Sequence, residues 1–172
     1  RQIVNQVSED LRQCGLVVDI EILPSENWYA GGENSGLFGR RYDLGHLALP
    51  LRQEPLCDLF TSWQITGPAD VNNPETGQPY AGWGGLNSTG WWDKAYDVAC
   101  ETAVNTWPDS PDYTQTHIQA QTIFAQNLPM IPLFPRLKFA AASPEVIGFQ
   151  IDTTQESELW NLYQLDTTLS DK

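Results

Sequence analysis

The sequence has few positive charges. Nine lysines and arginines stand against 22 aspartates and glutamates, so the formal net charge is −13 at pH 7. A charge of this sign and size repels the phosphate backbone of nucleic acids and anionic membrane surfaces. No apolar run approaches the roughly 18 residues that a membrane-spanning helix requires. The composition therefore excludes nucleic acid as a partner, and the sequence contains no candidate transmembrane segment.

Signatures of metal binding and catalysis are also missing. Cys14, Cys57 and Cys100 form no C-x-x-C pair, and His46 and His117 have no carboxylate or cysteine partner at ligand spacing. The GWGG run lacks the Lys and Ser or Thr of a phosphate-binding loop, and no G-x-S-x-G, H-E-x-x-H or dinucleotide fingerprint occurs. We therefore expect no metal, no cofactor and no enzymatic activity. Because carboxylates are plentiful, an Asp/Glu pair of the glycosidase type stays open.

The length of the chain, 172 residues, is sufficient for one hydrophobic core. We expect a single domain over residues 1–172. The chain begins at Arg1 without an export signal, yet Ile3, Val7 and Leu11 already form a helical stripe. We interpret the chain as a fragment of a longer protein.

The apolar pattern predicts helices alternating with strands. We expect a helix over residues 2–14 closed by Gly15, a helical turn around Trp28 and a short helix over 56–63. Two longer helices should follow, one capped by Asp93 and one ending before Pro129. Strands are predicted over residues 16–23, 42–49 and 130–134.

The two longer helices each have one apolar face. The first face contains Tyr96, Ala99, Cys100, Ala103 and Trp107, and the second contains Ala120, Ile123, Phe124 and Leu128. Trp63 and Trp107 are expected in the core, and Asp97 is expected to interact with the helix dipole or with the amide of a neighbouring loop. Residues 67–90 have six glycines, three prolines and no periodicity, so we expect a functional or mobile loop.

Five segments stand in the order found in one known family: LRQCGLVVDIEI, YDLGHLAL, NSTGWWDKAYDVACETA, AQTIFAQNLPMIPLF and PEVIGF. Together they resemble the C-terminal lobe of the extracellular solute-binding proteins of ABC importers, family 5, the peptide/nickel-binding receptors. The resemblance implies an α/β fold, lobe II of a two-lobed periplasmic-binding-protein-like receptor, with a mixed sheet flanked by helices. Residues 159–166 would be the strand that returns toward lobe I.

The same resemblance implies a function outside the cytoplasm, in the periplasm or as a lipoprotein on the outer side of the cytoplasmic membrane. The receptor would capture an oligopeptide or an oligosaccharide between its two lobes and deliver it to the permease. Its partners would be the N-terminal lobe of the same protein and the ABC permease subunits. A carbohydrate-active hydrolase domain is the alternative, motivated by the acidic charge and by seven tryptophans.

Candidate ligand contacts come from three stretches. Peptide-binding members of the family carry acidic residues where this chain reads ALPLRQEP, so recognition of a free peptide N-terminus is not expected. Aromatic faces near the glycine-rich loop suit stacking on a sugar ring or a peptide side chain, and a guanidinium can reach a carboxylate or a hydroxyl. The candidates are Arg52, Glu54, Trp83, Asn87, Trp91 and Arg136.

One disulfide is expected if the protein is exported. Cys14 ends the first helix at its apolar edge, where a free thiol behaves as a small hydrophobic group. Cys57 and Cys100 each begin or lie in a helix that flanks the glycine-rich loop, and an exported protein meets an oxidising environment. We therefore expect Cys57 and Cys100 to pair.

Overall fold

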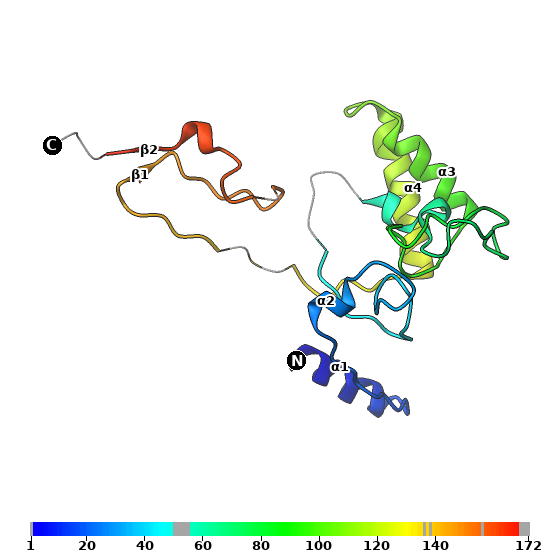
Figure 1. The fold of residues 1–172 in the computed structure, drawn as a ribbon. Helices are drawn as coiled ribbons and strands as arrows, with labels where there is room; N and C mark the ends of the chain where they lie inside the picture. The colour runs from blue at the N-terminus through cyan, green and yellow to red at the C-terminus, as the bar shows by residue number, and fades with distance from the viewer. Residues whose placement is uncertain (1, 50–55, 136, 138, 156, 169–172) are drawn as a thin grey trace. The chain divides into compact units, whose positions relative to one another are not determined.

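The structure is a computed structural model that describes residues 2–49, 56–135, 137, 139–155 and 157–168. The chain divides into two compact units, which we call unit 1 (residues 1–47 and 57–129) and unit 2 (residues 48–56 and 130–172). Most regular structure is helical, and the sheet of the described residues consists of two short strands (Figure 1).

The predicted α/β lobe with a mixed sheet flanked by helices is wrong. Residues 16–23, 42–49 and 130–134 contain no strand wherever the structure describes them, and residues 159–165 form turns and a short 3₁₀ helix. Alternating β-branched residues form a stable strand only when neighbouring strands supply hydrogen bonds and a surface to pack on. Here that support is missing, and Val17 at the centre of the first segment is 91% exposed.

The first helix, α1 (Gln2–Gln13), ends as the sequence predicts. The Gly15 amide donates to Arg12 O at 2.9 Å and the Leu16 amide donates to Leu11 O at 3.0 Å. This pair of bonds is the Schellman motif, which requires a left-handed residue at the position that Gly15 occupies with φ +85°. Glycine adopts that conformation without steric cost, so the helix stops there.

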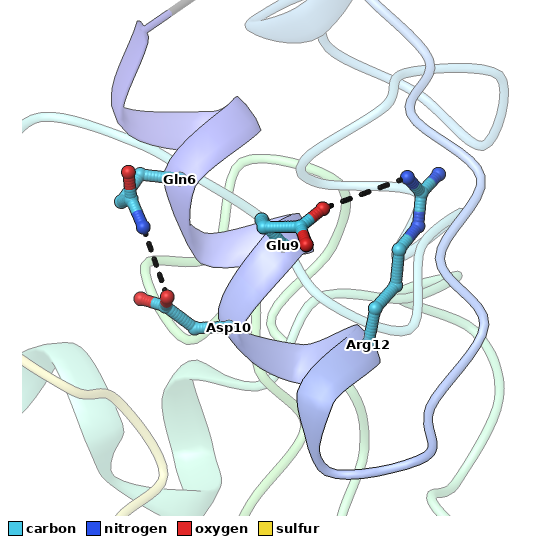
Figure 2. A network of polar contacts seen from close by, with 4 residues as sticks. All are labelled: Gln6, Glu9, Asp10 and Arg12. Carbon is cyan, nitrogen blue, oxygen red and sulfur yellow. Dashed lines mark hydrogen bonds and ion pairs between the residues drawn. The ribbon is translucent and has the colours of Figure 1, made fainter.

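The polar side of α1 carries two contacts between side chains, which Figure 2 shows. Gln6 Nε2 donates to Asp10 Oδ1 at 2.9 Å, and Arg12 Nη1 lies 3.9 Å from Glu9 Oε2. Both contacts join residues three or four positions apart, which are neighbours on a helix surface. They are exposed to solvent, so each contributes only a few tenths of a kcal/mol.

A short helix, α2 (Ser25–Trp28), begins a small packed cluster in unit 1. The Trp28 ring lies 5.5 Å from the Tyr42 ring between centroids and also covers the Cα of Gly36, where any side chain would collide with it. Tyr42 Oη donates to Ser88 O at 2.9 Å, which connects this cluster to the glycine-rich loop. The helical turn around Trp28 that the sequence predicts is confirmed.

Two 3₁₀ helices, η1 (Cys57–Phe60) and η2 (Ser62–Gln64), stand where a short α-helix was predicted. The glycine-rich loop that follows contains no helix and no extended strand, and only the isolated bridges Ile65–Asn87 and Asn72–Pro79 interrupt it. Backbone bonds nevertheless cross it at several points, such as the Ala81 amide donating to Ile65 O at 2.9 Å. The loop is therefore irregular but internally bonded.

Helix α3 (Lys94–Val104) and helix α4 (Pro111–Asn127) pack on each other and supply most of the core of unit 1 (Figure 1). Asp93 caps α3 by accepting from the Tyr96 amide at 2.9 Å, as predicted. Ser110 caps α4 in the same way at 3.1 Å, with Pro111 in the first turn. The buried apolar residues of this core are Cys57, Phe60, Ile65, Tyr96, Ala99, Cys100, Ala103 and Ala120.

Unit 2 has little regular structure. Strand β1 (Val146–Ile147) pairs antiparallel with β2 (Asp166–Thr167), and η3 (Leu162–Gln164) precedes β2. Among the described residues of this unit, only Asn161 is buried, and its Nδ2 donates to Gly148 O at 2.7 Å. A pair of two-residue strands is too small to be stable alone, and this buried amide adds a polar link to the strand end.

Candidate functional site

A disulfide joins η1 to α3 at the centre of unit 1. Cys57 and Cys100, the pair that the sequence singled out, have an S–S distance of 2.09 Å and a Cα–Cα distance of 5.7 Å. Both are buried, whereas Cys14 is free and exposed. The sulfur bridge joins α3 to η1, which precedes the glycine-rich loop in the sequence.

Tyr96 completes this junction. Its hydroxyl donates to Cys57 O at 2.7 Å, and its ring lies 5.0 Å from the Trp91 ring in an edge-to-face arrangement. Burial raises the pKa of Tyr96 well above its ordinary value, and the negative charges of Asp58 and Asp97 raise it further. The neutral phenol is the form that can donate to the carbonyl, so the geometry and the electrostatics favour the same protonation state.

Asn87 organises the glycine-rich loop from the inside. Its Nδ2 donates to Thr61 O at 3.0 Å and to Trp91 O at 2.8 Å. Its Oδ1 accepts from Thr89 Oγ1 at 2.8 Å and from the Gly90 amide at 3.1 Å. The side chain has no exposed surface. In this conformation Asn87 holds the loop together, and its amide is fully used in doing so.

Asp97 performs the role that the sequence predicts for it. Its Oδ1 accepts from the backbone amide of Ser62 at 2.9 Å, so the carboxylate near the start of α3 binds a neighbouring loop amide. This bond and the disulfide both connect α3 to residues 57–64.

The tryptophans divide between core and surface differently from the prediction. Trp91 is partly buried and contacts the rings of Tyr96 and Phe124 edge-to-face, so it belongs to the core. Trp63 and Trp107 were expected in the core but are 39% and 85% exposed. Trp107 follows the end of α3 at Val104, so the periodicity that placed it on the buried face no longer applies there. Trp83 is half-buried in the glycine-rich loop.

A polar cavity of about 340 Å³ opens in unit 1 beside this loop. Polar side chains predominate in its lining, which brings together a segment near residue 40 with three parts of the loop. The lining residues are Arg40, Asn73, Pro74, Glu75, Tyr80, Thr89 and Gly90. The volume lies within the range of small-molecule sites, about 300–1,000 Å³. This cavity is the candidate functional site.

Arg40 is held in the cavity wall by an unusual backbone. Its φ is +50°, in the left-handed region that favours glycine. Its amide donates to Leu37 O at 3.1 Å and the Arg41 amide donates to Gly36 O at 3.1 Å, the bonds of another Schellman-type turn. Glycine is the usual residue at this point of the turn. The chain instead has an arginine there and accepts the backbone strain.

The Arg40 guanidinium lies close to a ring and to a glycine. Its Cζ lies 5.7 Å from the centre of the Tyr80 ring, within cation–π range. It also lies close to Gly90, where a Cβ would collide with the guanidinium. The one ion pair among the described residues is Glu9–Arg12, so the charge of Arg40 faces no described carboxylate within 4.0 Å.

The lining also contains the exposed carboxylate of Glu75, which has one hydrogen bond from a side chain. Glu75 Oε2 accepts from the indole Nε1 of Trp92 at 3.1 Å. The Glu75 amide donates to Asn73 Oδ1 at 2.9 Å, which orients the Asn73 side chain and leaves its Nδ2 without a hydrogen bond to any other described residue. The cavity therefore combines one cation, one anion, an amide, a phenol and a hydroxyl.

Sequence reasoning did not find Arg40, Glu75 or Tyr80. The signal that could have pointed to Arg40 is its place in GLFGRRYDL, where a cation follows a glycine turn in a chain that has few cations. Of the predicted ligand contacts, Arg52, Glu54 and Arg136 lie outside the described residues. Trp83, Asn87 and Trp91 lie in or just after the loop that forms the cavity, but none of them lines it.

The part of the chain that the structure describes contains no group of three or more His, Cys, Asp or Glu side chains that could hold a metal ion. Among the same residues, no helix is both long enough and apolar enough to cross a membrane. The chain matches no protein-family model, and no curated protein or solved structure matches it either. The resemblance to family 5 stays a prediction.

Proposed function

We propose that this protein binds a small polar solute outside the cytoplasm and delivers it to an ABC importer, without chemical turnover. The observation that carries the proposal is the cavity of about 340 Å³ in unit 1, which has both charged and neutral polar groups in its lining. Such a set of groups suits the recognition of one small ligand by hydrogen bonds and charge. An oligopeptide or an oligosaccharide would offer one end or one residue to this cavity.

Two further features support the proposal. The Cys57–Cys100 disulfide agrees with a compartment in which disulfides persist, such as the bacterial periplasm or cell surface. The five segments in family order support uptake as the purpose of binding. Another lobe of the same protein and the permease subunits are the partners that belong to this proposal.

The lining of the cavity favours binding over glycoside hydrolysis. Glycosidases of the usual kind place two carboxylates about 5–10 Å apart around the scissile bond. Among the described residues, Glu75 is the only carboxylate in the lining, and its Oε2 already accepts from Trp92. A hydrolase would need a second acid near it.

Thermal-shift measurement on the purified, oxidised chain tests the proposal. The panel contains short peptides, β-linked oligosaccharides, single sugars and single amino acids, and a chromogenic glycoside assay runs in parallel. We expect at least one compound to raise the melting temperature, since a ligand that binds the folded state stabilises it, with no glycoside cleavage. Cleavage of a glycoside, or the absence of any stabilising compound in the panel, would overturn the proposal.

A further inference from the structure

We propose that the polar cavity recognises the zwitterionic head of a free α-amino acid, with Arg40 binding the carboxylate and Glu75 binding the ammonium. The proposal rests on the proposed function and names the ligand class for that site. The cavity lining contains the guanidinium of Arg40 and the carboxylate of Glu75, and these two groups form no ion pair with each other. Opposite charges held apart in one cavity complement a ligand that has both charges.

The carboxylate end is supported by how Arg40 is held. The guanidinium lies over the Tyr80 ring and against the Gly90 backbone, and both contacts limit its freedom before any ligand arrives. A preoriented guanidinium binds a carboxylate through two parallel hydrogen bonds. The left-handed backbone of Arg40 is a further sign, because strained residues collect at binding sites and the turn alone would be better served by glycine.

The ammonium end is supported by Glu75. The Trp92 indole bonds one of its oxygens, Oε2, at 3.1 Å and so orients the carboxylate. The other oxygen has no hydrogen bond to a described residue, and it can accept from an ammonium. Glu75 would repel a ligand with only a carboxylate, and Arg40 would repel one with only an ammonium. Both cavity charges contribute favourably when the ligand is a zwitterion. Recognition of a free amino terminus is unexpected only at the ALPLRQEP stretch, and the described residues that line this cavity come from other parts of the chain.

The neutral groups and the net charge agree with this choice. The Nδ2 of Asn73 is a spare donor, and Tyr80 adds a phenol to the lining, whereas the Thr89 hydroxyl already bonds Asn87 and the Trp91 amide. The chain carries a formal net charge of −13, so a simple anion would be repelled during its approach, whereas a zwitterion has no net charge to repel. The cavity volume of about 340 Å³ accommodates a single amino acid.

The test is calorimetric titration of the oxidised chain with each proteinogenic L-amino acid, followed by the N-acetyl and amide derivatives of the tightest one. We expect each derivative to bind at least tenfold more weakly than the free amino acid, because each lacks one of the two charges. Glucose and maltose complete the panel. Binding of a sugar but of no amino acid would overturn this inference and leave the proposed function standing. Binding of nothing would overturn this inference, and it would end the proposed function as well if the peptides and oligosaccharides of the thermal-shift panel also failed to bind.

Variants assign the two charges. Arg40→Gly suits the left-handed turn, so we expect an unchanged or higher melting temperature. We expect it to bind the free amino acid at least tenfold more weakly than the parent and no more tightly than the amide derivative. Glu75→Gln keeps an oxygen that accepts from Trp92. We expect this variant to bind the free amino acid no more tightly than its N-acetyl derivative. The controls are Arg41→Gln and Asp70→Asn, exposed neighbours outside the cavity lining, which should bind as the parent does. Full preference for the free amino acid in both cavity variants would overturn the assignment.

Discussion

Unit 1 and unit 2 are built from one chain but reach stability differently. Unit 1 has two packed helices, a disulfide and a buried tyrosine, whereas the described part of unit 2 has one buried residue and a pair of two-residue strands. Helices satisfy their own backbone hydrogen bonds, so a helical pair needs only an apolar seam. Strands need neighbours for theirs, so a segment with strand-like sequence and no neighbour stays irregular.

Exposed apolar side chains occur in both units, whereas the buried apolar side chains of the described residues all lie in unit 1. In unit 2, Ile131, Leu133, Phe134, Leu137 and Phe139 all have more than half of their surface open. In unit 1 the apolar faces of α3 and α4 are mostly covered by each other and by η1. Apolar residues therefore form a core only where their spacing matches the repeat of a helix or strand that packs against another element.

Removal of the disulfide should have the largest effect and should act on unit 1 alone. The bridge closes a loop of 43 residues, which in the chain-entropy model contributes about 4 kcal/mol to the free energy of unfolding. We expect the Cys57→Ala/Cys100→Ala variant to lose about that much in urea denaturation. Hydrogen exchange should show faster exchange in α3 and no change in β1 and β2. Cys14→Ala is the control, and equal stability of the double variant and the parent would contradict the prediction.

Replacement of Asn87 should be the next most damaging change. Asn87→Ala removes the hydrogen-bond partner of two carbonyls, Thr61 O and Trp91 O, and of the Gly90 amide. We therefore expect a loss of about 3 kcal/mol in the free energy of unfolding. The matched control is Asn105→Ala at the end of α3, where one exposed bond to Glu101 O is lost and about 0.5 kcal/mol is expected. The measurement is the urea midpoint of each variant. Similar losses for the two variants would show that the loop does not depend on its buried amide.

Tyr96 should make unit 1 sensitive to alkaline pH. The folded state raises the pKa of Tyr96, so above about pH 10 the unfolded chain releases the phenolic proton first and gains stability relative to the folded state. The contribution of Tyr96 is therefore complete below about pH 10 and is lost as the pH rises toward its folded pKa. We expect Tyr96→Phe to cost about 1–2 kcal/mol at pH 7 and to reduce the alkaline decline of stability.

The measurement for Tyr96 is the melting temperature between pH 7 and pH 11.5, a range chosen to bracket the ordinary tyrosine pKa of about 10. Tyr163→Phe in unit 2, where the side chain is 79% exposed, serves as the control and should follow the parent. An alkaline decline as steep in Tyr96→Phe as in the parent would show that another group causes it.

Asn161→Ala should have the smallest effect on the whole chain and should act on unit 2. It removes the donor to Gly148 O, which we expect to lower the local stability of unit 2 by about 1 kcal/mol. Amides of residues 146–148 should exchange about fivefold faster, while α3 and α4 keep their protection. Asn127→Ala at the end of α4 is the exposed control. Loss of protection in α4 in the Asn161 variant would show that the two units unfold together.

Local chemistry explains why several elements could be predicted. Gly15 closes α1, Asp93 caps α3 and Pro129 follows α4, and each effect depends on one residue acting on the backbone next to it. Asp97 likewise found a loop amide because its place near a helix start limits its partners. The predicted strands failed because a strand depends on partners distant in the chain, which local alternation cannot supply.

The sequence by itself determined where α1, α3 and α4 lie, the Asp93 cap, most of the apolar face that includes Cys100, and the acidic charge. These follow from composition and from interactions within a few residues. Only the tertiary structure decided that Arg40, Glu75 and Tyr80 share one cavity, because they come from separate turns. The buried side chain of Asn87 positions Gly90 in the cavity lining, and Arg40 contacts the Tyr80 ring. Sequence periodicity cannot predict this arrangement, because irregular loops position side chains by long-range contacts and not by a repeat.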